Sequence, residues 1–456
     1  MQKGEGSVML KTSFSKTRRP FGQPVAEAKG HPRYVKIPKA PPQNLVLPLE
    51  TVISGITDKL KKAGKLVFHT VGDTGPIKGE EVIKLVANQM EAQFAGAPKV
   101  GRPATLDPDK PTSTHPENGD PCFFYHLGDV VYFNGLVRDY QAQFYEPYQF
   151  YPTLIFAIAG NHDGDTKTQK NDQPDNEPSL EGFFDNFCAE QRQHLSAYRE
   201  TMTQPYVYWT LDAPYATIIG LYSNVDGSLD PLGVTQQQAW FEQQLRAADP
   251  QKCLILAVHH PCFSLDDDHG GYPDILASIQ DAAAKANRWP NLVMGGHVHN
   301  YQRFTQKLDD GRQIPHLVVG DGGYADTVAA MHKLQRDPTK NNAPITAPFA
   351  TDMAGVTLES YNEIAGGFGR ITVDGQNLTF DYFACPLTGA TPTKPFDSFT
   401  LNWKTQRITA SIKPGAGVDT KAKTPTVPKR RGAGKVPQGW PKNGPSRDRR
   451  PNPESL

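Results

Sequence analysis

The sequence has little that would connect it to a membrane or to a secretory route. Its 456 residues contain no run of about 18 to 20 apolar side chains, the length that a membrane-spanning helix needs. Its first segment, MQKGEGSVMLKTSFSKTRRP, lacks the apolar core of a secretory signal peptide. We therefore expect no membrane span and a cytoplasmic protein as the sequence stands, with secretion left open because a different N-terminus would change this prediction.

Cysteine is scarce and net charge is absent. Five widely spaced cysteines without a C-x-x-C pair indicate neither a disulfide framework nor a zinc ribbon, and we expect mostly buried, reduced thiols. Lys and Arg together number 48, as do Asp and Glu, so the formal net charge is zero. The overall charge therefore does not favour a protein that binds nucleic acid or a membrane surface. The hydrophobic fraction of 38% is enough for a substantial globular core.

The composition changes along the chain and predicts three parts. Residues 1–60 form an N-terminal arm, in which Gln43–Leu49 is apolar enough for an edge strand. Residues 61–405 form the main domain, which is expected to be catalytic. Residues 406–456 are rich in Pro, Gly, Lys and Arg and are expected to be a disordered basic tail. This tail is either solvated without a dedicated partner or binds a polyanion or an acidic partner.

Short apolar runs that end in Gly, Asp, Asn or His recur through the main domain and indicate buried strands. They are Lys65–Asp73, Pro121–Asp129, Pro152–Asn161, Cys253–His260 and Pro290–His299. Apolar residues at helical spacing in Gly79–Phe94 and Thr235–Ala247 indicate helices between some of these strands. Two alternating runs, Phe368–Val373 and Leu378–Phe383, predict an antiparallel pair joined by a loop that contains Asp374-Gly375. Strands that alternate with helices predict a layered α/β fold.

Five polar blocks at the ends of apolar runs contain side chains that bind metal ions. In chain order they are Gly72–Gly75, Gly128–Tyr132, Gly160–Asp163, His259–Pro261 and Gly296–His299. Two Lewis-acidic ions about 3.5 to 4 Å apart activate water and neutralise charge on a phosphate ester. Each block alone is more often a turn or a packing feature, but their order and completeness indicate a two-metal phosphoesterase site.

Asp129, Asp73 and Tyr132 provide the anionic ligands of the expected site. A carboxylate at a strand end, preceded by Gly128, presents its oxygens to both ions, so Asp129 is the expected bridge and Asp73 serves one ion. Tyr132 follows three residues later, and i, i+3 side chains meet on one side of a turn. A phenol with a pKa near 10 loses its proton readily only beside a strong Lewis acid, which favours a trivalent ion. These three ligands and a bridging hydroxide would only neutralise two divalent ions, whereas a trivalent and a divalent ion keep a positive charge for an anionic substrate.

The remaining expected ligands are an amide and imidazoles that suit Fe, Zn or Mn: Asn161, His259, His297 and His299. In an extended H-x-H both rings project from one face, so His297 and His299 are expected to reach two neighbouring ions. His162 is free to donate a proton to the leaving alkoxide or a hydrogen bond to phosphate. Asp163 either orients His162 or faces elsewhere.

Between about Lys65 and Phe383, the chain resembles the calcineurin-like metallophosphoesterases, and within them the purple acid phosphatases. The specific marks are Asp73 in G-D-x-G, Tyr132 in G-D-x-x-Y, and Gly296–Arg303, which matches G-H-V-H-x-Y-x-R. The resemblance implies a metallophosphoesterase fold of the α/β class. In that fold two mixed β-sheets form a sandwich flanked by helices, and the active site lies on loops at strand ends.

The resemblance also implies a role for each site residue. A ferric ion would be bound by Asp73, Asp129, Tyr132 and His299. A divalent Fe, Zn or Mn ion would be bound by Asp129, Asn161, His259 and His297. His162 would act with Asp129 in catalysis, and the substrate would be contacted by His162, His260 and Arg303.

We therefore expect an acid phosphatase-like hydrolase that cleaves small phosphate monoesters by attack of a metal-bound hydroxide. The close alternative is phosphodiester or nucleotide pyrophosphate hydrolysis on the same metals, because metal ligands do not fix the substrate. A further alternative is a non-catalytic scaffold that binds protein or a polyanion, although a scaffold has no need of a complete set of metal ligands.

Overall fold

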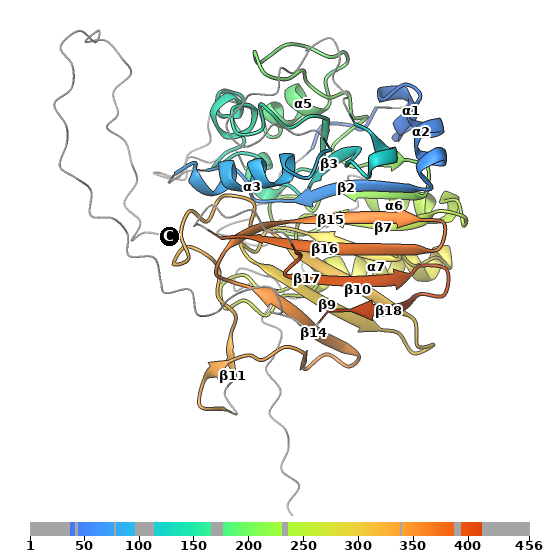
Figure 1. Cartoon of the computed structure of the whole chain (residues 1–456), viewed down its shortest axis with the longest axis vertical. Helices are drawn as coiled ribbons and strands as arrows, with labels where there is room; N and C mark the ends of the chain where they lie inside the picture. The colour runs from blue at the N-terminus through green and yellow to red at the C-terminus, as the bar shows by residue number, and fades with distance from the viewer. Residues whose placement is uncertain are drawn as a thin grey trace, which may run out of the picture.

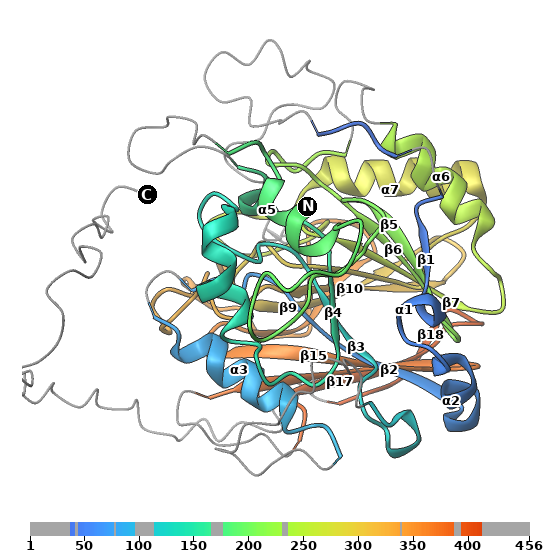
Figure 2. The same cartoon turned by 90° about the horizontal axis from the view of Figure 1, so that it is seen from above.

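The computed structural model describes residues 37–412, apart from 42–43, 77–78, 96–113, 166–176, 230–235, 338–339 and 387–393. Within these ranges two mixed β-sheets pack face to face, with helices outside them (Figure 1, Figure 2). The predicted metallophosphoesterase-type sandwich is confirmed. Most of the predicted disordered tail, with the polyanion or acidic partner proposed for it, lies outside the described residues.

One sheet has seven strands, and its parallel part contains three of the predicted ligand-bearing runs. In spatial order the strands are β18 (Arg407–Ser411), β17 (Asp397–Asn402), β16 (Asn377–Cys385), β15 (Gly366–Asp374), β2 (Lys65–Val71), β3 (Phe123–His126) and β4 (Leu154–Ala157). β2, β3 and β4 are parallel, and β15 and β16 form the predicted antiparallel pair. The boundary predicted at residue 405 is wrong, because β18 pairs with β17 and extends the domain to Ser411.

The other sheet has nine strands and contains the remaining ligand-bearing runs. In spatial order they are β1 (Val46–Pro48), β5 (Trp209–Asp212), β6 (Ala216–Leu221), β7 (Cys253–Val258), β8 (Leu292–Gly295), β10 (Gln313–Val319), β9 (Tyr301–Lys307), β14 (Val356–Asn362) and β13 (Phe349–Ala350). β6, β7, β8 and β10 are parallel. β1 is the edge strand predicted in the N-terminal arm and pairs with β5. A separate two-stranded ribbon consists of β11 (Arg336–Asp337) and β12 (Ala343–Pro344).

Most of the helices cover the outer faces of the sandwich, whereas the one-turn helix α4 (Asn161–Gly164) follows β4 and is largely buried. The other helices are α1 (Leu49–Val52), α2 (Ile56–Ala63), α3 (Glu81–Glu91), α5 (Glu181–Phe187), α6 (Gln237–Ala247) and α7 (Pro273–Ala286), with the short turns η2 (Pro116–Asn118), η3 (Val137–Asp139) and η4 (Gln141–Tyr145). α3 and α6 fall on the two predicted helices. Figure 2 shows α6 and α7 together on the nine-stranded sheet, whereas α3 packs against β15. Within the described ranges, no helix is both long and apolar enough to cross a lipid bilayer.

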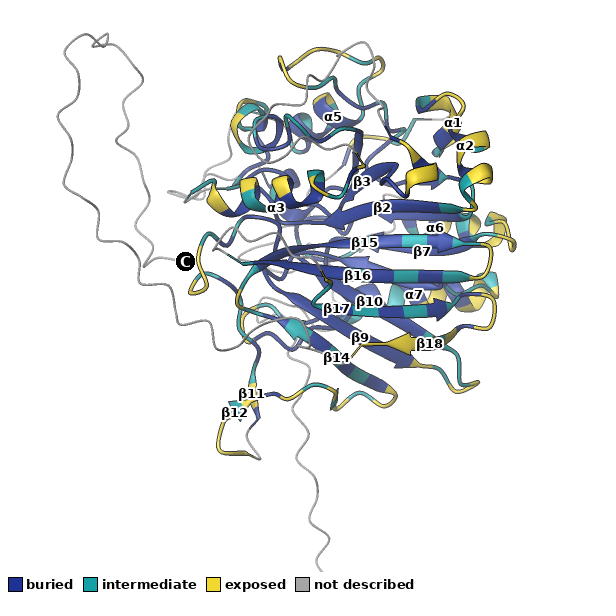
Figure 3. Cartoon of the chain, in the orientation of Figure 1, coloured by how far each residue is buried: buried dark blue, intermediate teal, exposed yellow. Residues whose placement is uncertain are grey.

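The central parallel strands of the nine-stranded sheet, β6, β7 and β8, are apolar and buried on both faces because both faces are covered. Ile218 and Ile255 belong to the core between the two sheets, whereas their neighbours Ile219 and Leu256 belong to the core beneath α6 and α7. A strand buried on both faces is a continuous apolar run in the sequence. In the seven-stranded sheet, which lies in front in Figure 3, β2 and β3 are buried along nearly their whole length, whereas β15 and β16 have half-buried residues and α2 and α3 have exposed ones. All five cysteines are free thiols and four of them are buried, as expected.

Candidate metal centre

The predicted ligands lie in the loops that follow β2, β3, β4, β7 and β8. The carboxyl ends of parallel strands are the usual position of a site in an α/β sheet, and here two sheets contribute such ends to one place. Backbone hydrogen bonds hold the loops together: Gly72 N–H donates to Val319 O at 2.9 Å, and Asp73 N–H donates to Gly128 O at 2.9 Å. All predicted ligands are buried, with exposed fractions of 7% or less: Asp73, Asp129, Tyr132, Asn161, His259, His297 and His299.

The first group of ligands surrounds the hydroxyl of Tyr132. This hydroxyl donates to Asp129 Oδ2 at 3.0 Å and to Asp73 Oδ1 at 3.2 Å. His299 Nε2 lies 3.3 Å from the Tyr132 hydroxyl and 3.5 Å from Asp73 Oδ1. The structure therefore brings together the four residues predicted for the ferric ion.

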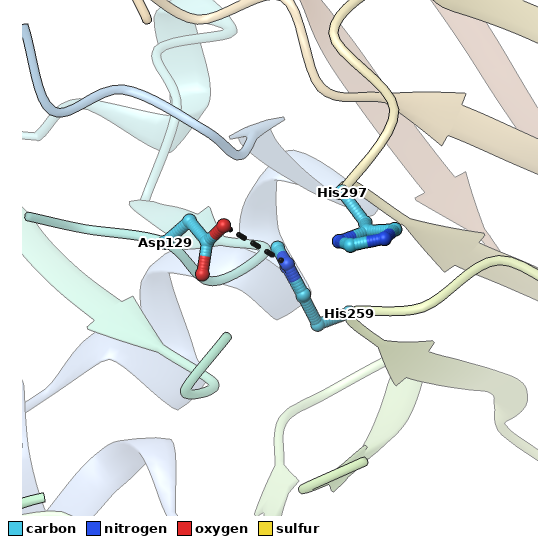
Figure 4. A group of neighbouring side chains, drawn as sticks. All are labelled: Asp129, His259 and His297. Atoms are coloured by element: carbon cyan, nitrogen blue, oxygen red, sulfur yellow. Dashed lines mark ion pairs between the residues drawn. The ribbon is translucent and has the colours of Figure 1, made fainter. Parts of the chain in front are cut away.

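The second group surrounds the amide of Asn161. Its Oδ1 lies 2.9 Å from His297 Nδ1 and 3.1 Å from His259 Nε2. His259 Nε2 is also 3.3 Å from Asp129 Oδ2. Figure 4 shows Asp129, His259 and His297 pointing toward one another, and one donor atom from each lies within 4.8 Å of the others. Asp129 therefore belongs to both groups and lies between them.

The spacing of these donor atoms fits metal coordination. Two donor atoms that each lie about 2.1 Å from one ion, at right angles, are about 3 Å apart. Within each group, neighbouring side-chain donor atoms are 2.9 to 3.5 Å apart. Carboxylate, phenol, amide and imidazole donors are also a chemically suitable set for Fe, Zn or Mn. The residues therefore fit two ions that share Asp129.

Three of the ligands have left-handed backbone conformations, with φ of 57° at Asp73, 54° at Asp129 and 68° at His297. Such a conformation costs a residue other than glycine about 1 to 3 kcal/mol and is concentrated at functional sites. At His297 it contradicts the predicted extended H-x-H. This segment is a loop between β8 and β9, in which Val298 N–H donates to Gly296 O at 2.8 Å. The two histidines reach separate groups because of this turn, not because of a strand repeat.

Asp163 holds the loop that carries Asp129. Its Oδ2 accepts hydrogen bonds from the N–H groups of Asp129 and Gly160, both at 2.8 Å. Its Oδ1 accepts from Val130 N–H at 3.1 Å. The sequence left open whether Asp163 orients His162 or faces elsewhere. The structure favours the second alternative, because Asp163 faces away from the His162 ring and positions the backbone of Asp129.

Protons bound to these side chains would compete with metal ions at the candidate site. Burial raises the pKa of Tyr132 well above its usual value, and the charges of Asp129 and Asp73 raise it further. Burial, together with the charge of Asp129, also raises the pKa of Asp73. For His259, burial acts to lower the pKa, but the carboxylates of Asp129 and Asp73 outweigh it and raise the pKa to about 9. Metal binding must therefore displace protons from these side chains.

Neighbouring groups fix the rings of two of the histidines. His259 Nδ1 bonds to the carbonyl of Leu127 at 2.8 Å, which leaves Nε2 facing the other ligands. His297 Nε2 lies 2.8 Å from the hydroxyl of Tyr272, which leaves Nδ1 facing Asn161. Partners of this kind orient a ligand and set its tautomer in metalloproteins.

His162 lies beside the ligands. Its backbone N–H donates to Asp129 Oδ1 at 2.9 Å, and its ring Nδ1 bonds to the carbonyl of Phe133 at 2.8 Å. Its ring centre is 4.5 Å from that of Tyr132. This position is compatible with the predicted contact to substrate.

The other two residues predicted to bind substrate differ in outcome. His260 is buried, with Nδ1 2.6 Å from Ser223 Oγ and its ring centre 4.2 Å from that of His297, so it borders the ligand groups. The prediction for Arg303 is wrong in this structure. Its guanidinium makes two bonds to the buried Asp397, at 2.7 and 3.0 Å. Because Arg303 lies in β9 and Asp397 in β17, this ion pair joins the two sheets.

Sequence reasoning missed three rings around the site. The ring centres of Tyr324 and His332 lie 4.2 Å and 4.3 Å from the ring centre of His299. The ring centre of His269 lies 4.6 Å from that of His297. Tyr324 directly follows Gly320-Asp321-Gly322-Gly323 at the end of β10, which is a signal that could have identified it. His269 and His332 lie in irregular loops, and no local pattern marks them.

A second acidic and histidine-containing group lies next to the ligands, with donor atoms of Asp266, His269 and His332 within 4.8 Å of one another. Internal hydrogen bonds occupy the Asp266 carboxylate and His332 Nδ1 here. The Asp266 carboxylate accepts hydrogen bonds from the Ser264 hydroxyl and from the N–H groups of Asp268, His269 and Gly270. His332 Nδ1 accepts from His299 N–H at 3.0 Å. We therefore interpret this group as a support for its loops.

Comparison with known proteins agrees with this geometry. The family model described as calcineurin-like phosphoesterase matches residues 104–301, which include six of the seven expected ligands, Asp73 being the exception. Two curated proteins of Arabidopsis thaliana are similar: purple acid phosphatase 21, 25% identical over 33% of this chain, and purple acid phosphatase 22, 23% identical over 43%. The chain spans only 35% and 41% of the lengths of these two proteins.

Among solved structures, the purple acid phosphatase PPD1 from yellow lupin (Lupinus luteus) seeds aligns with 74% of this chain and 54% of its own, at 18% identity and a TM-score of 0.49. The family match covers Tyr132 and the first part, Gly296–Tyr301, of the Gly296–Arg303 block. The chain is therefore related to the calcineurin-like phosphoesterases and, within them, is similar to the purple acid phosphatases.

Proposed function

We propose that this chain is a binuclear metal-dependent phosphoesterase that hydrolyses phosphate monoesters of small molecules. The observation that carries the proposal is the pair of buried ligand groups that share Asp129. The match of residues 104–301 to the calcineurin-like phosphoesterases supports the phosphoesterase part of the proposal. Bound at these groups, two metal ions would supply an activated water and neutralise charge on the phosphate ester.

The proposed metals are Fe(III) at the Tyr132 group and a divalent Fe, Zn or Mn at the Asn161 group. The position of the Tyr132 hydroxyl within 3.2 Å of two carboxylates supports the first assignment, because a phenol loses its proton readily only beside a strong Lewis acid. The second group has two imidazoles and one amide in addition to the shared carboxylate, and such a set suits a divalent ion.

His162 is the proposed proton donor to the leaving group. Its Nδ1 donates to the carbonyl of Phe133, a bond that keeps the Nδ1 proton in place. The proton that the imidazolium gives up is then the one on Nε2. His162→Ala should therefore reduce turnover while both metals stay bound.

Metal analysis and visible absorption test the proposal. We expect about two metals per chain, one of them iron, and a phenolate-to-iron absorption band that disappears in Tyr132→Phe. Tyr125→Phe is the matched control, because the buried Tyr125 hydroxyl has no hydrogen-bond partner among the described residues and its loss should leave the band intact. Asp129→Ala should lose both metals and turnover together. An active protein without iron and without the band would contradict the ferric assignment.

The substrate class requires a separate measurement. Comparing kcat/KM for an aryl phosphate monoester and a bis-aryl diester separates the proposed reaction from phosphodiester hydrolysis. A higher value for the diester would favour the alternative activity on the same metals. Metal-loaded protein without turnover of a monoester, a diester or a nucleotide pyrophosphate would favour the scaffold.

A further inference from the structure

The three histidines of the candidate metal centre are held in different ways. His259 Nδ1 has a carbonyl partner, and His297 Nε2 has a phenol partner. His299 differs, because its Nε2 faces Tyr132 while its Nδ1 is buried with no hydrogen-bond partner among the described residues. A ligand histidine is usually oriented by a hydrogen bond from its second nitrogen. Something else must therefore orient the ring of His299.

Two aromatic rings lie against His299. Tyr324 has its ring centre 4.2 Å away with the planes 43° apart, and His332 has its ring centre 4.3 Å away with the planes 22° apart. Both distances are slightly shorter than the roughly 4.5 to 7 Å that is typical of ring–ring contacts. Tyr324 and His332 make no ring contact with each other in the part of the chain that the structure describes, as expected if they cover opposite faces of His299.

Hydrogen bonds attach both rings to the loops that carry ligands. His332 Nδ1 accepts from His299 N–H at 3.0 Å, and Asn300 Nδ2 donates to the carbonyl of His332 at 2.9 Å. Tyr324 N–H donates to the carbonyl of Asp73 at 2.9 Å. The Tyr324 ring also lies 4.3 Å from the ring of Tyr132, so it touches two ligands of the same proposed ion.

The loop that contains His332 is itself fixed. Asp267 N–H donates to the carbonyl of Lys333 at 2.9 Å, and Gln335 N–H donates to the carbonyl of Leu265 at 2.8 Å. These bonds join the loop after β10 to the loop after β7, so the His332 ring is held from two directions. A ring fixed in this way can restrict the rotation of the ring that it covers.

We propose that Tyr324 and His332 are positioning residues that orient His299 by packing their rings against it, in place of the hydrogen bond that usually orients such a ligand. This inference rests on the proposed function, because it concerns the ion bound by Tyr132 and His299. It assigns the two rings to one ion only. The ion held by Asn161, His259 and His297 should be insensitive to them.

Metal retention in purified full-length protein tests the inference. Wild type and variants are loaded with Fe(III) and Zn²⁺ and dialysed against EDTA, and the remaining metals and the visible band are measured. Tyr324→Ala and His332→Ala should weaken iron retention by about 10- to 100-fold and shift or remove the band, with zinc retained as in wild type. Tyr324→Phe, which keeps the ring and removes only the hydroxyl, should behave like wild type.

Tyr272→Phe is the matched control on the other ion. It removes the partner of His297, so zinc retention should fall while iron and its band stay as in wild type. Tyr324→Leu serves if the alanine variant does not fold, since it fills space without supplying a ring. Circular dichroism confirms that each variant is folded.

Three results would overturn the inference: ring-removing variants that retain iron and the band, equal loss of both metals, or a Tyr324→Phe variant that loses iron as Tyr324→Ala does. Failure of the proposed function looks different. A wild type that retains two metals but hydrolyses no phosphate ester would overturn the proposed function and leave the metal-retention test of Tyr324 and His332 intact. A wild type that binds neither metal would overturn both.

Discussion

Acid sensitivity is a consequence of buried histidines, and His316 offers the simplest test. This residue lies in β10 with an exposed fraction of 4%, its Nε2 is 3.0 Å from Gln306 Oε1, and its Nδ1 is buried without a partner within the described residues. Burial lowers its pKa from 6.5 to about 3. The folded protein therefore keeps His316 neutral at pH values where the unfolded chain binds a proton.

The sign and size of the effect follow from linkage. Above pH 6.5 both states are neutral and His316 contributes nothing that depends on pH. As the pH falls from 6.5 toward 3, the unfolded state gains a proton that the folded state does not, so the free energy of unfolding decreases by about 1.4 kcal/mol per pH unit. At pH 5 the loss is about 2 kcal/mol for this one side chain. His69 and His126, whose pKa values burial also lowers to about 3, act with the same sign.

His316→Gln removes the titrating group and keeps a polar side chain of similar size. We would measure unfolding by urea at pH 7.5 and pH 5 for wild type and variant. The decrease in unfolding free energy between the two pH values should be about 2 kcal/mol smaller in the variant, because all other groups cancel in the comparison. His194→Gln, at a side chain that is 57% exposed, controls for the substitution itself. Equal pH dependence in wild type and His316→Gln would refute this reasoning.

Three further predictions concern the ion pair and the metal site. Arg303→Met should destabilise the protein by about 3 to 5 kcal/mol in chemical denaturation, because it leaves the buried Asp397 unpaired, and adding Asp397→Leu should recover most of this loss. A double variant as unstable as the single one would contradict this reading. Asp163→Asn should weaken retention of both metals by about 10- to 100-fold, since it loosens the loop of the shared Asp129; selective loss of one metal would argue against it. Affinity for a divalent ion should rise with pH up to about 9, the pKa of His259, and calorimetry in two buffers should show proton release on binding. Affinity that does not change between pH 6 and pH 8 would disprove competition between protons and the metal ion.

The strands and most residues of the candidate site could be predicted from the sequence because their signals are local. An apolar run that ends in Gly-Asp or His-His gives both the strand and the side chain at its end, so the positions of Asp73, Asp129 and His259 follow from neighbours in the chain. The contact of Tyr132 with Asp129 was also predictable, since the two residues are only three positions apart in the chain. The chemistry of these residue types then indicated metals without any knowledge of the fold.

The misplaced residues depend on distant partners or on unusual backbone conformations. Arg303 fits a ligand-adjacent motif, but its partner Asp397 is 94 positions away and no local pattern connects the two. The left-handed backbone of His297 turns a motif that looks like a strand into a loop. His332 reaches His299 from a segment that has no periodicity, so only the assembled structure identifies it.

The ligands come from both sheets, and this has a consequence for the order of assembly. Asp73, Asp129 and Asn161 follow strands of one sheet, whereas His259 and His297 follow strands of the other. Neither sheet alone contains a complete set for either ion, so high-affinity binding must wait until the two halves have docked. If the proposed ions bind there, each would cross-link the halves and add about 4 kcal/mol to their association at a free concentration a thousandfold above its dissociation constant. Removing metal should therefore loosen the junction between the sheets before it affects either sheet internally.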